Sequence, residues 1–200
     1  MISRAVQQIF IKAYTIIKLN LFFWGLSLCG GLVLGVGPAL LVINELYYDY
    51  DFHYGQMSWK VAWKLFKENF TEGNKLFYSF AIVIFLLGYS LFLSVQLHGL
   101  TFIVTDFIIA IVLLATICIY AYVLNIKVSF EINLINSFKL ACAHFFYNFF
   151  DNMKEILGIA VIIGITYKFS GLILFATFSL TVVYTQFVGK NWQSHVEELN

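Results

Sequence analysis

Long apolar runs alternate with shorter segments of mixed polarity along the chain. The apolar runs cover residues 19–48, 76–97, 102–126 and 156–188, and the second of them contains no charged residue. About 20 apolar residues in a helix suffice to cross the hydrocarbon layer of a membrane. We therefore predict an all-α polytopic membrane protein with about five transmembrane helices, because the last run is long enough for two.

The last apolar run admits two interpretations. It contains Lys168 near its middle, followed by Gly171. One long tilted helix would place this lysine at mid-membrane, at a cost of roughly 3 kcal/mol. Two short spans joined by residues 167–171 would place the lysine at a membrane surface, and we favour this arrangement.

Two shorter segments, 58–70 and 137–149, have the pattern of amphipathic helices. The first has aromatic residues on one face and lysines on the other: Trp59, Trp63 and Phe66 against Lys60, Lys64 and Lys67. Helices of this kind lie in the membrane surface, with aromatic rings at headgroup depth and lysines toward the phosphates. The alternative is that the same apolar face packs on a protein core.

The two amphipathic segments are also related in sequence. At an offset of 79 residues, the matched pairs include Trp59 and Phe138, Lys60 and Lys139, and Asn69 and Asn148. A repeat at a fixed offset is an architectural signal. We predict an internal two-fold repeat, with halves at approximately 19–97 and 102–188, within a single integral membrane domain, 1–200.

The matched asparagines, Asn69 and Asn148, each stand beside the aromatic residue that ends an amphipathic helix. One interpretation is a helix C-terminal cap, because asparagine tolerates the left-handed conformation. The other is a contact surface for a cytoplasmic partner, shared with the aromatic and basic residues of the same helices. The cap is favoured.

The first apolar run contains Pro38, the single proline of the chain, preceded by Gly35 and Gly37. A proline ring cannot donate to the helical hydrogen-bond ladder and pushes against the preceding turn. We predict a kink or break at Gly35, Gly37 and Pro38 within one full span. A re-entrant hairpin that breaks at the same place is the competing interpretation.

The basic residues indicate an orientation. Segments 49–75 and 127–155 hold seven of the twelve lysines and arginines. Positive charge accumulates on the cytoplasmic side of membrane proteins, so both amphipathic helices are expected there. Residues 1–18, which mix apolar and basic positions, are expected to form an interfacial helix leading into the membrane.

Glu45 and Asp106 are ionisable residues inside predicted spans, which makes each a hypothesis about function. Glu45 lies near the inner end of its span, where pairing with a lysine of the amphipathic helix and extension toward water both explain it. Asp106 lies near the start of its span. Capping of the helix N-terminus together with Thr105 is the favoured explanation there.

Composition excludes several classes of protein. Hydrophobic residues make up 61% of the chain and charged residues 12%, whereas a soluble domain carries roughly a quarter charged residues. The net charge of +1 offers no dense basic footprint for nucleic acid. The expected partner is the lipid bilayer.

No stretch of the sequence carries a pattern typical of catalysis. The three cysteines are odd in number and far apart, and the four histidines are scattered, so neither a disulfide framework nor a metal site is expected. Phosphate-binding loops, nucleophile elbows and metalloprotease helices have no counterpart here. We therefore expect no cofactor and no enzymatic activity.

Three stretches together resemble the YesL-like family of bacterial integral membrane proteins. They are residues 20–24 (NLFFW), 35–39 (GVGPA) and 63–70 (WKLFKENF). The family is a domain of unknown function, and the resemblance supplies no catalytic residue.

The resemblance implies a multi-pass protein of the bacterial cell membrane, associated with carbohydrate uptake and polysaccharide utilisation. On that basis we expect an accessory or assembly component, with an ABC-type carbohydrate permease as a possible partner. A small-solute transporter is the alternative, because an internal repeat and a broken span are common in transporters.

Overall fold

The computed structural model describes residues 2–130 and 132–197, which are helical almost throughout and contain no strand. The helices are α1 (Ile2–Cys29), α2 (Val36–Tyr50), α3 (Trp59–Glu68), α4 (Phe70–Ser94), α5 (Leu100–Ser129), α6 (Leu134–Tyr147), α7 (Phe149–Lys168), α8 (Leu172–Phe175) and α9 (Thr177–Glu197). The all-α prediction is confirmed.

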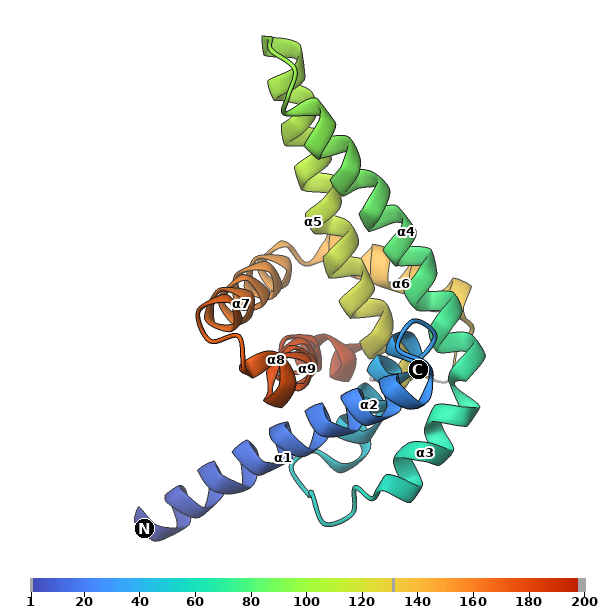
Figure 1. The fold of residues 1–200 in the computed structure, drawn as a ribbon, viewed down its shortest axis with the longest axis vertical. Helices are drawn as coiled ribbons and strands as arrows, with labels where there is room; N and C mark the ends of the chain where they lie inside the picture. Colours follow the sequence, from blue (N-terminus) through green and yellow to red (C-terminus); the bar gives the residue numbers. More distant parts are fainter. Residues whose placement is uncertain (1, 131, 198–200) are drawn as a thin grey trace.

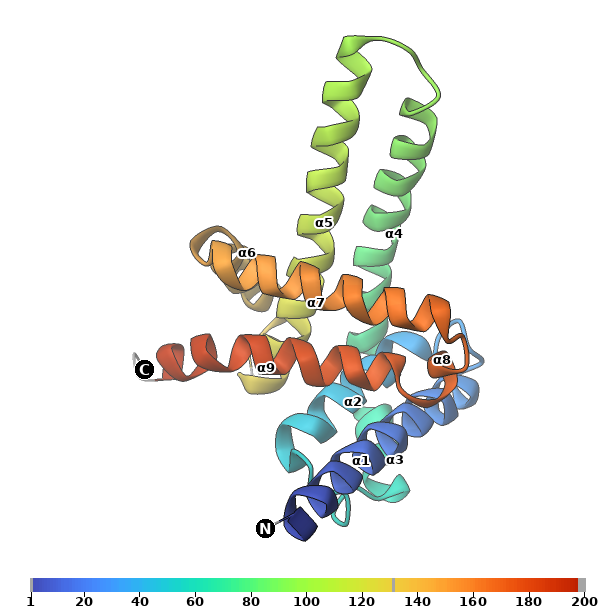
Figure 2. The ribbon, with the colours of Figure 1, turned by 90° about the vertical axis from the view of Figure 1, so that its left-hand side faces the viewer.

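The most prominent feature is a long hairpin formed by α4 and α5 (Figure 1). Its tip, at residues 95–99, projects far from the other helices, which gather around its base. Figure 2 shows α7 and α9 side by side, running across the direction of the hairpin. The molecule therefore consists of an apolar projection and a packed base.

The base contains two clusters of buried apolar side chains. One joins α1, α2, α3 and α9, and its buried members include Leu19, Phe23, Leu26, Val42, Ile43, Leu46, Phe66 and Val182. The other joins α2 and α4 to α5 and α6, and includes Leu41, Leu76, Phe80, Val123, Ile126 and Ala141. Since α2 contributes to both clusters, it is the element that connects the two parts of the base.

Three helices of the described residues are long and apolar enough to cross a membrane: Arg4–Cys29, Phe70–Ser94 and Leu100–Ser129. The last two match the predicted spans 76–97 and 102–126. The predicted break in the last apolar run is present, because α7 ends at Lys168 and α9 begins at Thr177. Neither α7 nor α9 is among the three candidate spans, so the total of about five stays a prediction.

The prediction of one full span over residues 19–48 is wrong. The chain forms two helices, with α1 ending at Cys29 and α2 beginning at Val36. The Lys18 ammonium donates to the carbonyl of Tyr54 over 2.8 Å, so the segment after α2 lies beside the middle of α1. The two helices therefore form a hairpin, as in the competing interpretation.

The turn between these helices has a local cause. Gly31 has a φ of +74°, a conformation that glycine adopts without steric penalty. The amide of Gly31 donates to the Leu28 carbonyl at 3.0 Å, and the amide of Leu32 donates to the Ser27 carbonyl at 2.7 Å. This pair of bonds is the Schellman motif that closes helix C-termini.

Pro38 does not make the break. It is the third residue of α2, where a backbone N–H has no partner within the helix, so its absence costs nothing. The break thus begins N-terminal to the predicted kink at Gly35, Gly37 and Pro38. The proline lies in the first turn of α2 and does not bend a continuous helix.

The buried side chain of Asn20 joins the two ends of the chain. Its oxygen accepts hydrogen bonds from the amides of Phe178 and Ser179, at 3.0 and 3.2 Å, and its nitrogen donates to the carbonyl of Ile173 at 3.0 Å. The amides of the first helical turn lack partners within their own helix. A side chain of α1 thus caps the start of α9.

Candidate functional site

The glycines around Pro38 allow two helices to approach closely. A Cβ atom added at Gly37 would lie 2.6 Å from the carbonyl oxygen of Gly73, and one added at Gly73 would lie 2.6 Å from the Cα atom of Pro38. A side chain larger than hydrogen at either glycine would meet the facing backbone. Two of the three predicted kink residues, Gly37 and Pro38, therefore form the contact between α2 and α4, whereas Gly35 lies against the backbone of Ser27.

The first amphipathic helix, α3, begins with a capped turn. The hydroxyl of Ser58 accepts a hydrogen bond from the amide of Val61 at 3.3 Å, which satisfies one of the unpaired first-turn donors. The lysines of its polar face, Lys60, Lys64 and Lys67, are exposed.

The apolar face of α3 packs mainly on the protein. Phe66 is 4% exposed, so the expectation that this ring lies among lipid headgroups is wrong. Trp59 is 43% exposed and packs against Phe22 of α1, with ring centroids 5.7 Å apart. Trp63 is half-buried and stacks on Phe66.

Both matched asparagines lie at a junction between two helices. The amide of Asn69 donates to the Leu65 carbonyl at 2.9 Å, and the amide of Asn148 donates to the His144 carbonyl at 3.0 Å. Each therefore ends one helix, as predicted. Their φ angles are −89° and −114°, so neither uses the left-handed conformation that we expected.

The candidate site is a polar cavity of about 390 Å³ between α2, the Asn69 junction, α4 and α5. It is lined by Leu41, Glu45, Asp49, Asn69, Glu72, Lys127 and Val128. Two of the predicted residues, Glu45 and Asn69, meet here. Three carboxyl groups and one lysine give this cavity a net negative character.

Hydrogen bonds and one ion pair order the cavity wall. The side-chain amide of Asn69 donates to the Glu45 carboxylate at 2.7 Å. Lys127 lies 2.9 Å from the Glu72 carboxylate, so this ion pair joins the bases of α4 and α5. Glu45 therefore pairs with an asparagine, and the predicted lysine partner from the amphipathic helix is not observed.

The environment of the cavity makes the two carboxyl groups outside the ion pair, those of Glu45 and Asp49, weaker acids. Burial raises the pKa of Glu45, and the hydrogen bond from Asn69 partly opposes this. Burial also raises the pKa of Asp49. A desolvated carboxyl group is easier to protonate, and it attracts cations and hydroxyl donors. Chemically, the cavity suits a small cationic or hydroxyl-bearing ligand.

The remaining predicted residues lie outside this cavity. Phe138 and Lys139 are exposed on α6. Asp106 lies almost two turns inside α5, whose N-cap residue is Gly99, and the Thr105 hydroxyl donates to the Thr101 carbonyl. The prediction that Asp106 and Thr105 cap this helix is therefore wrong.

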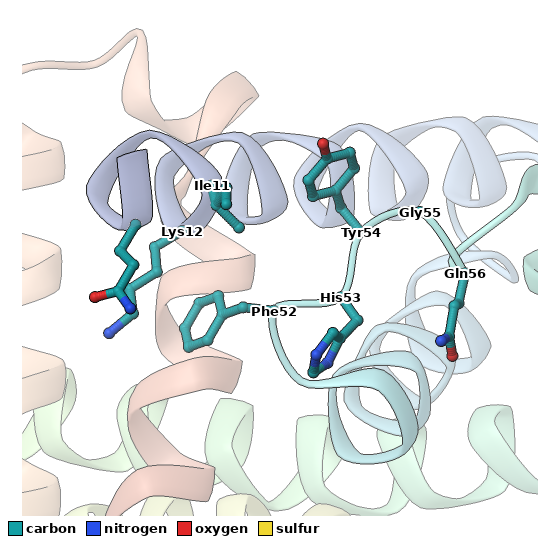
Figure 3. Close-up of a pocket in the computed structure, with 8 residues that line it drawn as sticks. Ile11, Lys12, Phe52, His53, Tyr54, Gly55 and Gln56 are labelled. Carbon is teal, nitrogen blue, oxygen red and sulfur yellow. The ribbon is translucent and has the colours of Figure 1, made fainter. Parts of the chain in front are cut away.

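A second hollow, of about 540 Å³, lies between α1 and the segment that joins α2 to α3. Figure 3 shows Ile11 and Lys12 on α1, with Phe52 and Tyr54 of the joining segment beside this helix. The Lys12 ammonium lies 5.2 Å from the centre of the Phe52 ring. This hollow is basic and aromatic, in contrast to the acidic cavity near Glu45.

Sequence reasoning missed a buried polar cluster in the second half of the chain. The Tyr122 hydroxyl donates to the Asn152 side chain at 3.0 Å, and the rings of Tyr122 and His144 lie 4.5 Å apart. Glu155, one turn beyond Asn152, is 0% exposed. Asn152 and Glu155 stand three residues apart, and therefore on one face of α7, which is the one signal that the sequence offered.

Among the side chains that the structure describes, in residues 4–130, 132–190 and Trp192, no group of three or more His, Cys, Asp or Glu is placed to hold a metal ion. The three carboxyl groups near Lys127 therefore do not converge on one point.

Comparison with known proteins supports the resemblance proposed from the sequence. The family model described as "Protein of unknown function, DUF624" matches the chain. The match covers residues 16–91. This domain family is the one commonly called YesL-like. The matched part runs from α1 to α4 and contains Asn20, Glu45, Asn69 and the contact of Pro38 with Gly73. No curated protein and no solved structure gives a significant match.

Proposed function

We propose that this membrane protein is a non-enzymatic accessory or assembly component of the bacterial inner membrane, linked to carbohydrate uptake or polysaccharide utilisation. The observation that carries the assembly role is the exposed apolar surface of the α4–α5 hairpin. In the most apolar 18 residues of α4, only 11% of the stretch is buried within the described structure, and in those of α5 only 6%. Lipid, or helices of another membrane protein, must therefore cover it.

The distribution of charge supports an orientation for the hairpin. Its tip, at residues 95–99, carries no lysine or arginine, whereas Lys75 and Lys127 lie at its base. By the positive-inside rule, the base faces the cytoplasm. The exposed lysines and aromatic residues of α3 and α6, including Lys60, Phe138 and Lys139, then offer a cytoplasmic docking surface.

The carbohydrate connection and the choice of partner rest on the YesL-like resemblance. The partner that this resemblance favours is the membrane subunit of an ABC-type carbohydrate permease. Its transmembrane helices would pack on the outer face of α5, where Ile103 and Phe107 are 65% and 68% exposed. Van der Waals packing drives such helix association in lipid.

Site-specific photo-crosslinking in native membranes tests this proposal. A photo-reactive residue in place of Phe107 should form an adduct with the permease subunit, identified by mass spectrometry. The same residue at Ile126, which is 1% exposed at the base of α5, is the matched control and should give no adduct. Adducts of Phe107 with lipid alone would contradict the proposal.

The acidic cavity favours a second candidate function, transport of a small solute. Carboxyl and amide groups of Glu45, Asn69 and Glu72 face one space between helices, and intramembrane transport sites are often built in this way. Flux of radiolabelled sugars or cations into liposomes containing the purified protein tests this candidate. Flux that is unchanged by Glu45→Gln would exclude the cavity as the route.

A further inference from the structure

Glu155 on α7 is a buried carboxyl group that no hydrogen bond compensates within the described structure. The residue is 0% exposed, and neither carboxyl oxygen has a hydrogen-bond partner among the described residues. An isolated charged carboxylate in such an environment is strongly unfavourable, and the group avoids this cost by keeping its proton. The packing of the described residues around Glu155 must therefore accommodate its carboxyl group without a hydrogen bond.

The groups around Glu155 do not supply a positive charge. From α5, Cys118 and Tyr122 lie close enough to interact electrostatically with it, and from α9 so does Tyr184. On α7 itself, Lys154 is exposed and pairs with Asp151 at 3.0 Å.

His144 of α6, beside Tyr122, is the remaining candidate for a positive charge. Burial lowers the pKa of this histidine to about 4, so its ring is neutral at physiological pH. Among the described side chains no cation therefore offsets an ionised Glu155, and burial raises the pKa of this carboxyl group to about 8.

We propose that Glu155 is a proton-binding site that holds α7 against α5 and α9. With the proton bound, the neutral acid is compatible with the tight contact between Gly158 of α7 and Tyr184 of α9. On release of the proton to bulk water, the carboxylate requires hydration. Water reaches it only if α7 moves away from its neighbours, so the docking of α7 depends on pH.

The direction of the effect follows from linkage. In the open state Glu155 is hydrated and has an ordinary pKa near 4.5, whereas in the closed state its pKa is about 8. The closed state is fully stabilised below the open-state pKa of Glu155 and is weakened as the pH rises toward its closed-state pKa. The open population should increase about tenfold per pH unit in this interval and level off above it.

The native cysteine Cys118 provides a reporter because it is 1% exposed and near Glu155. Replacing Cys29 and Cys142 by serine leaves Cys118 as the single thiol of the full chain. The rate of its modification by a small uncharged thiol reagent is measured in nanodiscs between about pH 5 and pH 9. Thiol ionisation also depends on pH, so each rate is divided by that of the Glu155→Gln variant.

The proposal predicts that this ratio rises about tenfold per pH unit and levels off near the pKa of Glu155. Asp151→Asn, four residues earlier on the same helix, is the matched control and should behave as the wild type does. A ratio that stays constant with pH would overturn the proposal.

Infrared spectroscopy of the wild-type protein gives a measurement that needs no folded variant. The carbonyl stretch of a buried protonated carboxyl group should disappear with a midpoint near pH 8. The absence of such a band at neutral pH would also overturn the proposal. Where Glu155→Gln folds, loss of this band assigns it to Glu155, and its persistence would contradict the assignment.

Discussion

The two segments that match in sequence, α3–Asn69–α4 and α6–Asn148–α7, share a local form and differ in what they contact. In each, an amphipathic helix ends at an asparagine whose amide donates to a carbonyl one turn earlier. In the first, the following helix belongs to the projecting hairpin. In the second, it lies across that hairpin and packs against α9 (Figure 2).

The difference is clearest four residues after each asparagine. Gly73 follows Asn69 and lies against the backbone of Pro38, whereas Asn152 follows Asn148 and bonds to the buried Tyr122. Small residues allow helices to approach closely, and buried polar residues require complete hydrogen bonding. The first segment is therefore held by close backbone packing and the second by a polar network.

The largest expected effect comes from filling the close contact in the first segment. A Cβ atom at Gly73 would lie 2.6 Å from the Pro38 backbone, so Gly73→Leu should destabilise the protein by about 3 kcal/mol or more. Gly88→Leu is the matched control on the same helix, because a Cβ atom there meets nothing within 4 Å. Thermal unfolding in detergent measures both, and equal stability of the two variants would refute close packing at Gly73.

The next effect concerns the polar network of the second segment. Asn152→Ala removes the partner of the Tyr122 hydroxyl and a bond to the Phe145 carbonyl. Leaving a buried polar group unsatisfied costs about 1–3 kcal/mol. If the network acts as a unit, adding Tyr122→Phe to this variant should cost less than Tyr122→Phe alone. A double-mutant cycle on the unfolding free energy measures the coupling between the two residues. Strictly additive effects of the two substitutions would rule out the network.

A smaller effect should separate the two asparagines by their pH dependence. Asn69 donates to Glu45 and thereby opposes the increase in the pKa of Glu45 that burial causes. A carboxyl group with a raised pKa stabilises the fold less as the pH rises above its unfolded value. Asn69→Ala should therefore lower stability by about 1 kcal/mol, with a larger loss at pH 7 than at pH 4.

Asn148→Ala is the comparison for this experiment, because its side chain contacts His144 and no carboxylate. Its loss of stability should stay constant from about pH 5.5 to 7, where the His144 ring is neutral in the folded protein. The measurement is chemical unfolding at several pH values. A parallel decrease for both variants would remove Glu45 from the explanation.

The elements with the simplest sequence signal were predicted best. Apolar stretches with at most one charged residue predicted α4 and α5, and the alternation of aromatic residues and lysines predicted α3. The hairpin of α1 and α2 was not the favoured prediction, because hydropathy continues through the turn and a single glycine, Gly31, closes the first helix. Pro38 attracted attention, although its position in the first turn makes it harmless.

The candidate sites depend on contacts that sequence spacing does not contain. Glu45 and Asn69 were each identified, but their hydrogen bond joins α2 to the start of α4. Glu155, Tyr122 and His144 come from three helices, so no motif connects them. The depth at which a polar residue is buried follows from tertiary packing, and Glu155 is recognised only when its neighbours are known.

The smallest predicted effect compares the starts of the two amphipathic helices. Ser58 is the N-cap residue of α3 and accepts a bond from the Val61 amide, whereas Asn133, the N-cap residue of α6, makes no side-chain capping bond. Removal of a helix cap costs about 1 kcal/mol. Ser58→Ala should therefore lower the unfolding free energy by about this amount, and Asn133→Ala should leave it nearly unchanged. Chemical unfolding of the two variants under identical detergent conditions is the measurement, with Ser58→Thr retained as a variant that keeps the acceptor oxygen. If Asn133→Ala is as damaging as Ser58→Ala, the two helices begin in the same way and the difference between the segments starts only after their asparagines.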